Sequence, residues 1–186
     1  MKRDRNLQQI LLSLTGITLV SSLLGCELLF GSDNLVQRVS DGDTITALDP
    51  GGNKLSVRFA CVDAPEVARS AKQKKSRRLV DKSQFKWGER AKKRVEELVE
   101  QGGDRVTLNI TDTDRYGRQV AEVRLNDGTF VQEVLAREGL ALVYRPYLKN
   151  CPSADAVEQA EAEAKRRRRG LWSDSRFVPP WDYRKQ

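Results

Sequence analysis

The sequence predicts an α+β domain built on a small, closed, five-stranded β-barrel, with helices between and after the strands. Two observations lead to this prediction. Short segments with alternating apolar residues recur between turn signals, as barrel strands require. Longer segments with apolar residues at helical spacing fall between and after them. No internal repeat accompanies the pattern, so the 186 residues indicate one domain with extensions.

The predicted strands are short and separated by turn signals. Pro50-Gly51-Gly52-Asn53 separates the second strand from the third, and Asn126-Asp127-Gly128 is predicted to form a hairpin turn. The OB-fold is the leading architecture for a small barrel of this kind. The predicted strands are 35–39, 44–48, 54–61, the alternating segments around Val106, Leu108, Ile110 and around Ala121, Val123, Leu125, and a candidate last strand at 140–144.

Three helices are predicted from apolar residues at one-face spacing. Each is followed by glycine, which most easily adopts the left-handed conformation that ends a helix. The last helix also has Ser153 in position to cap its N-terminus. The helices carry, in order, Ala91, Val95, Leu98 and Val99 before Gly102; Val131, Val134 and Leu135 before Gly139; and the segment from Ser153 to Arg169 before Gly170.

The N-terminus has the pattern of an export signal. Residues 2–5 carry three positive charges, and the apolar stretch 10–24 has a length that suits a secretory signal better than a membrane span. The stretch ends in Leu23-Leu24-Gly25-Cys26, which resembles the bacterial lipoprotein box. We therefore expect an exported, membrane-anchored lipoprotein of the cell envelope with lipid on Cys26. The alternatives are an uncleaved signal anchor and a plain secretory signal.

The predicted organisation has four parts. They are a lipoprotein-type signal peptide at 1–25, a tether at 26–34, the folded domain at 35–174 and a C-terminal tail at 175–186. Within the domain, the segment 69–94 holds twelve Lys or Arg against two acidic residues. Such a run is either a nucleic-acid contact or a solvated face, and both interpretations stay open.

Composition limits the chemistry that the chain can perform. The formal net charge is +7, which favours a polyanionic partner, with nucleic acid first and anionic membrane second. The chain has no histidine, which excludes histidine bases, His-ligated zinc, and Ser–His or Cys–His nucleophile pairs. Three scattered cysteines without a CxxC pair argue against a zinc site. Hydrolytic chemistry would therefore rest on carboxylates, Arg, Lys, Tyr and hard metal ions.

Three clusters carry such groups. The first, Ser40-Asp41-Gly42-Asp43-Thr44, places two carboxylates at a turn before a strand. In the second, Arg58 on a strand is followed by Asp63 and Glu66. The third, Asp114-Arg115-Tyr116-Gly117-Arg118, is a turn with two arginines and a tyrosine. Each cluster alone also fits a structural role, such as a solvated turn, a strand-end salt bridge or a polar hairpin loop.

Together the clusters match the needs of phosphodiester hydrolysis. A hard cation prefers oxygen ligands, so Asp43 and Asp63 could share one. A nearby carboxylate, Glu66, could activate or orient a water molecule. Charge that develops on the phosphoryl oxygens could be stabilised by the forked guanidiniums of Arg58 and Arg118, whose planar geometry matches phosphate.

In this order the clusters resemble the thermonuclease (staphylococcal nuclease-like) family, over about residues 35–174. The resemblance implies an OB-fold barrel with three helices and one calcium ion. It also implies cleavage of DNA and RNA, preferably single-stranded, that leaves 3′-phosphates. Beyond the three clusters, the family pattern includes Trp87-Gly88-Glu89-Arg90-Ala91, Gly139-Leu140-Ala141 and Gly170-Leu171-Trp172-Ser173.

The resemblance assigns roles residue by residue. It implies Asp43 and Asp63 as calcium ligands, with the backbone carbonyl of Ala64, where the family often has Thr, as a further ligand. Glu66 matches the residue regarded as the general base. The remaining matches are Arg58 and Arg118 as the catalytic arginines, Asp41 as an acidic residue that supports the metal site, Arg115 and Tyr116 as contacts to a terminal phosphate, and Tyr144 as a further substrate tyrosine.

Two segments depart from the family pattern. The stretch between Glu66 and Trp87 is longer and more basic than in the shortest members, and the tail after Trp172 has no clear counterpart. Neither segment contains any of the five core residues. These are Asp43, Arg58, Asp63, Glu66 and Arg118.

Export also predicts a disulfide. If Cys26 carries lipid, Cys61 and Cys151 remain, and paired cysteines are the normal state in an oxidising compartment. The alternative is two free thiols, with Cys61 packed as a small apolar residue.

Two other function classes compete with a monomeric nuclease. One is a catalytically inactive OB-fold lipoprotein that only binds nucleic acid, and the other is a structural envelope protein whose basic stretch touches anionic lipid. Retention of all five core residues favours the nuclease, because a pure binder needs no metal pocket beside two arginines.

Overall fold

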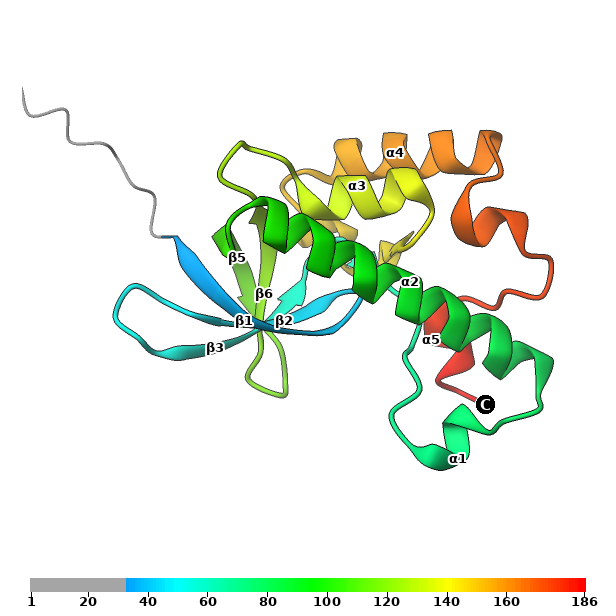
Figure 1. Ribbon diagram of the computed structural model, residues 1–186. Helices are drawn as coiled ribbons and strands as arrows, with labels where there is room; N and C mark the ends of the chain where they lie inside the picture. Colours follow the sequence, from blue (N-terminus) through cyan, green and yellow to red (C-terminus); the bar gives the residue numbers. More distant parts are fainter. Residues whose placement is uncertain (1–32) are drawn as a thin grey trace, which may run out of the picture.

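The computed structural model describes residues 33–186, and Figure 1 shows a β-barrel flanked by helices. Within this range, strands β3 and β6 run parallel in the barrel and all other neighbouring strands run antiparallel. The predicted α+β fold on a closed five-stranded barrel is confirmed. Its strands follow one another in the order β1 (Asn34–Asp41), β2 (Thr44–Leu48), β3 (Lys54–Phe59), β6 (Gln119–Arg124) and β5 (Arg105–Thr113).

The predicted signal peptide, Cys26 and the tether up to residue 32 lie outside the described residues. Asn34, the last residue of the predicted tether, already belongs to β1 and pairs with Val106 of β5. Among the helices of residues 33–186, none combines the length and the apolar character that a membrane span requires.

Residues 33–186 contain the three predicted helices and two shorter ones. Figure 1 shows α2 running from the region of α1 and α5 to the barrel, and α3 lying beside α4. The last long helix ends at Arg166 rather than at the predicted Arg169. The helices are α1 (Ala71–Lys74), α2 (Leu79–Gln101), α3 (Val131–Glu138), α4 (Ala154–Arg166) and α5 (Pro180–Tyr183), with 3₁₀ turns at Arg145–Asn150 and Gly170–Ser173.

The hydrophobic core lies between the barrel and these helices. Ile45, Val57 and Val106 are completely buried on the inner faces of three barrel strands. The apolar stripe predicted for α2, which includes Ala91 and Val95, is buried in the same cluster. Burial of this kind is the main favourable contribution to folding, so it fixes the barrel that carries the loops described below.

One predicted strand is interrupted by a tight turn. Cys61 has a φ of 71°, and the N–H of Val62 donates to the carbonyl of Ala60 at 2.8 Å, which closes a three-residue γ-turn. The turn ends the predicted strand 54–61 early and leads into β4 (Val62–Asp63), which pairs with β7 (Leu142–Val143) in a separate small sheet. The candidate last strand at 140–144 is therefore shorter than predicted and lies outside the barrel.

The turn predicted at Asn126-Asp127-Gly128 is present, and the Leu125 N–H donates to the Thr129 carbonyl across it at 3.0 Å, but the chain after it does not continue as the second strand of a hairpin. This turn joins β6 to α3, because Phe130 makes a single bridge to Arg124 and the chain then becomes helical. The helix is preferred there since it buries the apolar residues of the 131–138 segment against the barrel. The loop 114–118 is the one that joins the antiparallel strands β5 and β6.

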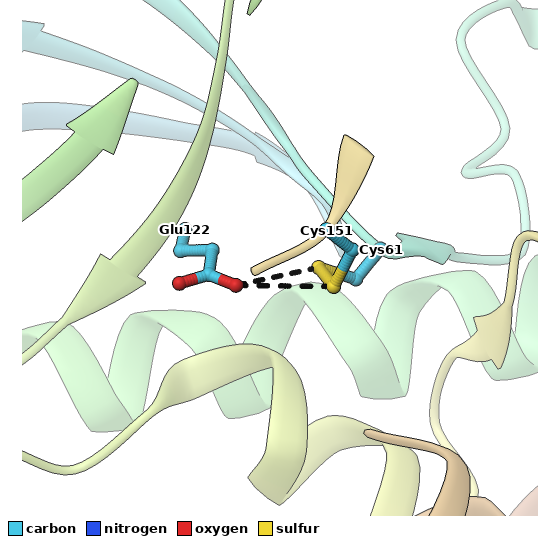
Figure 2. Close-up of side chains that lie close together, drawn as sticks. All are labelled: Cys61, Glu122 and Cys151. Atoms are coloured by element: carbon cyan, nitrogen blue, oxygen red, sulfur yellow. Dashed lines mark hydrogen bonds between the residues drawn. A yellow bond between two sulfur atoms is a disulfide. The ribbon is translucent and has the colours of Figure 1, made fainter. Parts of the chain in front are cut away.

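The predicted disulfide between Cys61 and Cys151 is present (Figure 2). The carboxylate of Glu122 points at the bond, with Oε1 3.8 Å from both sulfurs. Glu122 is buried and accepts hydrogen bonds from the Ser153 N–H at 2.6 Å and the Ser153 hydroxyl at 3.1 Å. Ser153 stands at the predicted N-cap position of α4, but its hydroxyl binds Glu122 instead of the first turn.

Two glycines allow the loops that carry carboxylates to pack closely against α2. A Cβ on Gly42 would lie 2.5 Å from the Cβ of Ala91, and one on Gly88 would lie 2.1 Å from the carbonyl oxygen of Glu66. Contacts this short leave no room for any side chain. The loop between β1 and β2 and the segment that follows β4 therefore meet on the same stretch of α2.

We predict that the disulfide contributes substantially to stability. The double variant Cys61→Ala/Cys151→Ala should unfold in urea with a free energy about 2–4 kcal/mol lower than the oxidised wild type, because the bridge closes a long loop in the unfolded chain. The two cysteines are 90 residues apart in the sequence. Reduced wild-type protein should match the variant, whereas the variant should not respond to reductant. Equal stability of the variant and the oxidised wild type would contradict this account.

Candidate active site

The structure brings the sequence-predicted site residues to one cleft of about 630 Å³. The cleft lies where the loop between β1 and β2, the segment after β3 and the loop between β5 and β6 converge. Asp63 is the exception, since it is completely buried and is not part of the cleft wall. The predicted residues that line the cleft are Asp41, Asp43, Arg58, Ala64, Glu66, Arg115, Tyr116, Arg118 and Tyr144.

Arg58 joins the two aspartates that were predicted to hold a cation. Its strand position places it opposite Thr44, next to Asp43, in the β2–β3 register. One Nη donates to Asp63 Oδ1 at 2.5 Å, and the other pairs with Asp43 Oδ1. Burial disfavours the charged guanidinium, but the charges of Asp43 and Asp63 outweigh it and raise the pKa of Arg58 above its ordinary value. Arg58 therefore stays protonated and fixes the separation of the two carboxylates.

Asp43 is also held by the backbone. Its Oδ2 accepts a hydrogen bond from the Ala64 N–H at 2.6 Å. Burial acts to raise the pKa of Asp43, but the charge of Arg58 and the hydrogen bond from Ala64 prevail and lower the pKa below its ordinary value. Asp43 is thus held ionised at the start of β2, with its carboxylate directed at the residue that follows Asp63.

The two other aspartates are less well compensated. Burial, followed by repulsion from Asp43, raises the pKa of Asp41 to about 6, although Arg69 pairs with Asp41 at 2.7 Å. Burial and the same repulsion raise the pKa of Asp63, against the opposing charges of Arg58 and Arg184. Three carboxylates therefore crowd a poorly hydrated region, where additional positive charge would be stabilising.

This donor set suits a hard cation. The carboxylates offer oxygen ligands only, and the chain has no histidine. The sulfurs near Glu122 cannot bind a metal ion because they are joined in the disulfide. Oxygen ligands without nitrogen or sulfur are the set that calcium prefers, so Asp43 and Asp63 fit the predicted ion.

Glu66 lies beside the aspartates at the cleft. It follows Pro65, and its carbonyl group is the one that packs against Gly88 of α2. Its side chain is about one quarter exposed, at 26%, and Oε1 accepts a hydrogen bond from Arg184 Nη1 at 2.8 Å. A carboxylate that reaches both solvent and the cleft can accept a proton from a water molecule.

Arg118 is positioned by the loop that carries it. Asp114 accepts hydrogen bonds from the Arg118 N–H at 3.0 Å, from Arg118 Nε at 2.7 Å and from the Tyr116 N–H at 2.9 Å. Gly117 allows the turn through a φ of 79°. The guanidinium carbons of Arg115 and Arg118 lie 5.0 and 5.8 Å from the centre of the exposed Tyr116 ring. The loop therefore presents two cations and an aromatic face to the cleft.

Tyr144 occupies the other side of the site. Its ring stacks on Tyr147, with centroids 5.6 Å apart, and meets Trp181 at the same distance. The Tyr144 N–H donates to the carbonyl of Cys61 at 2.8 Å, so the disulfide-linked turn and this aromatic group are directly connected. Flat aromatic surfaces beside cations are typical of sites that bind single-stranded nucleic acid.

Sequence reasoning missed three residues that contact the site. Arg69 pairs with Asp41, Asp114 holds Arg118, and Arg184 binds both Asp63 and Glu66. Asp114 belonged to a predicted cluster without a role of its own, and Arg69 was one charge within a basic run. Arg184 lies in the tail that we placed outside the folded domain, and no motif around it indicates a contact. The tail is part of the packed structure, because Pro180 is buried.

The chain matches known proteins over most of its length. Residues 56–174 match the family model described as staphylococcal nuclease homologue. An uncharacterized endonuclease of Escherichia coli O157:H7 is 33% identical over 150 residues, which cover 80% of this chain and 82% of the relative. A micrococcal nuclease of Shigella flexneri is 32% identical over 158 residues, covering 81% and 79%. Endonuclease YncB of Bacillus subtilis (strain 168) is 38% identical over 144 residues, covering 77% and 63%.

These matches agree with the geometry of the cleft. The family model spans Arg58, Asp63, Glu66 and Arg118, and its match ends at residue 174, where the predicted domain ends. The resemblance inferred from the sequence motifs is confirmed, and the chain belongs to the staphylococcal nuclease family of nucleic-acid-cleaving enzymes.

Proposed function

We propose that this protein is a calcium-dependent nuclease that hydrolyses DNA and RNA, prefers single strands and leaves 3′-phosphates. The observation that carries the proposal is the convergence of Arg58, Glu66 and Arg118 on one cleft beside the paired carboxylates of Asp43 and Asp63. A cleft that only bound nucleic acid would not need buried carboxylates, because they repel phosphate.

Asp43 and Asp63 would hold the calcium ion, with the backbone carbonyl of Ala64 as a further ligand and Asp41 as a supporting negative charge. Calcium, when bound, supplies positive charge that polarises a phosphoryl oxygen. The N–H of Ala64 already binds Asp43, which keeps this backbone segment next to the carboxylate. The segment directly after β4, which carries Ala64 and Glu66, would therefore serve both the cation and the general base.

The two arginines would stabilise the charge that develops on the transferred phosphoryl group. Arg58 reaches the cleft from a barrel strand, and Arg118 reaches it from the loop between β5 and β6. Guanidiniums held in fixed positions need little reorganisation during the reaction, which is the basis of electrostatic catalysis. Asp114 provides this support for Arg118 by accepting one hydrogen bond from its backbone N–H and one from its side-chain Nε.

Glu66 would act as the general base. It would accept a proton from the attacking water, while the bond between phosphorus and the 5′ oxygen breaks and the 5′ oxygen takes up a proton from solvent water. The products are then a 3′-phosphate and a 5′-hydroxyl. The substrate would also be contacted away from the reacting bond. Arg115 and Tyr116 would bind a terminal phosphate, and Tyr144 would offer its aromatic surface.

Several further properties belong to the same proposal. We expect the protein to act as a monomer. The basic stretch 69–94, which forms α1 and much of α2, would raise affinity for nucleic acid through phosphate contacts without selecting sequence. The competing function, a lipoprotein that binds nucleic acid without cleaving it, would require that the five core residues have no catalytic role.

We predict that cleavage of single-stranded DNA and RNA depends on calcium. Activity should be present with calcium, absent in excess chelator and poor with magnesium, because magnesium demands stricter octahedral geometry. End analysis of a labelled oligonucleotide should show 3′-phosphates that a phosphatase removes. The variant Asp43→Asn serves as the control and should lose the calcium response. Full activity of the wild type in excess chelator would contradict the proposal.

We also propose that the protein is exported and that Cys26 is acylated after removal of residues 1–25. The observation that supports this proposal is the lipoprotein-like sequence Leu23-Leu24-Gly25-Cys26. In cell fractionation, wild-type protein should sediment with membranes, whereas Cys26→Ala should leave the membrane fraction. A Cys26→Ala protein that stays with membranes at its unprocessed mass would show a signal anchor instead.

A further inference from the structure

The C-terminal segment 175–186, called the strap here, folds back along α2 and reaches the active-site cleft. Figure 1 shows α5 and the C-terminus lying next to the first half of α2. Asp174, just before the strap, accepts hydrogen bonds from Ser83 at 2.9 Å and from Trp87 Nε1 at 3.1 Å. The strap therefore begins at a fixed point on α2.

Contacts along the strap hold its helix against the domain. The Tyr183 hydroxyl donates to Asp81 Oδ1 at 3.0 Å, and its ring meets Phe85 edge-on at 6.1 Å. Arg78 Nη2 donates to the side chain of Gln186 at 2.8 Å. Trp181 touches Tyr144 on the cleft side. These contacts orient the helix so that the residue after Tyr183 faces the carboxylates.

Arg184 is that residue. Its Nη2 donates to Asp63 Oδ2 at 2.6 Å, and its Nη1 lies 3.3 Å from Asp63 Oδ1 and 2.8 Å from Glu66 Oε1. One guanidinium thus covers a proposed cation ligand and the proposed general base together. With Arg58 on Oδ1 as well, both oxygens of Asp63 have guanidinium partners.

A guanidinium and a divalent cation compete for such a carboxylate. Both would bind the same oxygen lone pairs, and their like charges repel each other in a poorly hydrated site. Arg58 is fixed on a barrel strand and its side chain is only 18% exposed. Arg184 stands near the end of the chain with a side chain 42% exposed. Of the two arginines, Arg184 is the one that can leave without disturbing the barrel.

We infer that the strap is an internal inhibitor, in which Arg184 occupies Asp63 and Glu66 until a divalent cation displaces it. This inference rests on the proposed function, because it gives Asp63 and Glu66 their roles. In the docked state Arg184 occupies Oε1 of Glu66 and competes with an attacking water molecule for this carboxylate. Cation binding releases the strap, which frees Glu66 and opens the cleft beside Tyr144.

Calcium affinity tests the inference without an activity assay. Isothermal titration calorimetry of the full chain in detergent compares the wild type with Arg184→Ala and with the matched control Lys185→Ala. Removal of Arg184 should tighten calcium binding about tenfold if the strap is docked about nine-tenths of the time. Lys185 is 74% exposed and pairs only with Asp182 among the described residues. Its removal should leave affinity within about twofold, because exposed charges are screened by salt.

Hydrogen exchange supplies the second readout. In the wild type, calcium should accelerate exchange of amides in residues 175–186, and in Arg184→Ala these amides should exchange rapidly with or without calcium. Equal or weaker calcium binding by Arg184→Ala, or a strap that calcium protects, would overturn the inference while leaving a calcium-dependent nuclease intact. Absence of calcium binding in all three proteins, together with absence of cleavage, would overturn the proposed function as well.

Discussion

The bridge that Arg58 makes between Asp43 and Asp63 is the interaction on which the rest of the site depends. It holds together two carboxylates that come from different segments of the chain, because both bind the same guanidinium. Removal of one member of a buried ion pair commonly costs about 3–5 kcal/mol, because the other charge stays buried without compensation. The barrel supplies that burial, since β2 and β3 pair in the register that sets Arg58 beside the start of β2. The pairing of β2 with β3, which helps to build the barrel, therefore also positions Arg58 and the carboxylates that it binds.

Close packing places the other groups around this bridge. Gly42 and Gly88 let two carboxylate-bearing loops lie directly on α2, so the backbone of Glu66 packs against this helix in addition to the contact of its side chain with Arg184. The γ-turn at Cys61 redirects the chain from the barrel into β4, and the disulfide ties this turn to the segment before α4. Such left-handed conformations of non-glycine residues cost about 1–3 kcal/mol and persist only where the surroundings enforce them. The positions of Asp63 and Tyr144 both depend on this turn.

The sequence was sufficient for the features that rest on local chemistry. Segments with alternating apolar residues predicted the barrel strands, and glycines predicted the ends of the helices. The three ordered clusters predicted the cleft residues and the family. It was insufficient where contacts between distant segments determine the local structure. Phe130 bridges to Arg124 and then enters a helix, so a turn typical of hairpins serves a helix instead. The contact of Arg184 with Asp63 joins residues 121 positions apart, and no periodicity or motif in the tail encodes it.

The most direct test of the account is the turnover of Arg118→Lys on single-stranded DNA in the presence of calcium. Arg118 is held by Asp114 outside the buried bridge, so this variant keeps the charge and the fold and loses only the planar fork. The Arg118→Lys protein should be folded by circular dichroism, and its turnover should be lower by about two to three orders of magnitude. The exposed Arg38→Lys, the matched control, should retain wild-type turnover. Near-normal turnover of a folded Arg118→Lys protein would contradict the claim that paired guanidiniums stabilise the transition state.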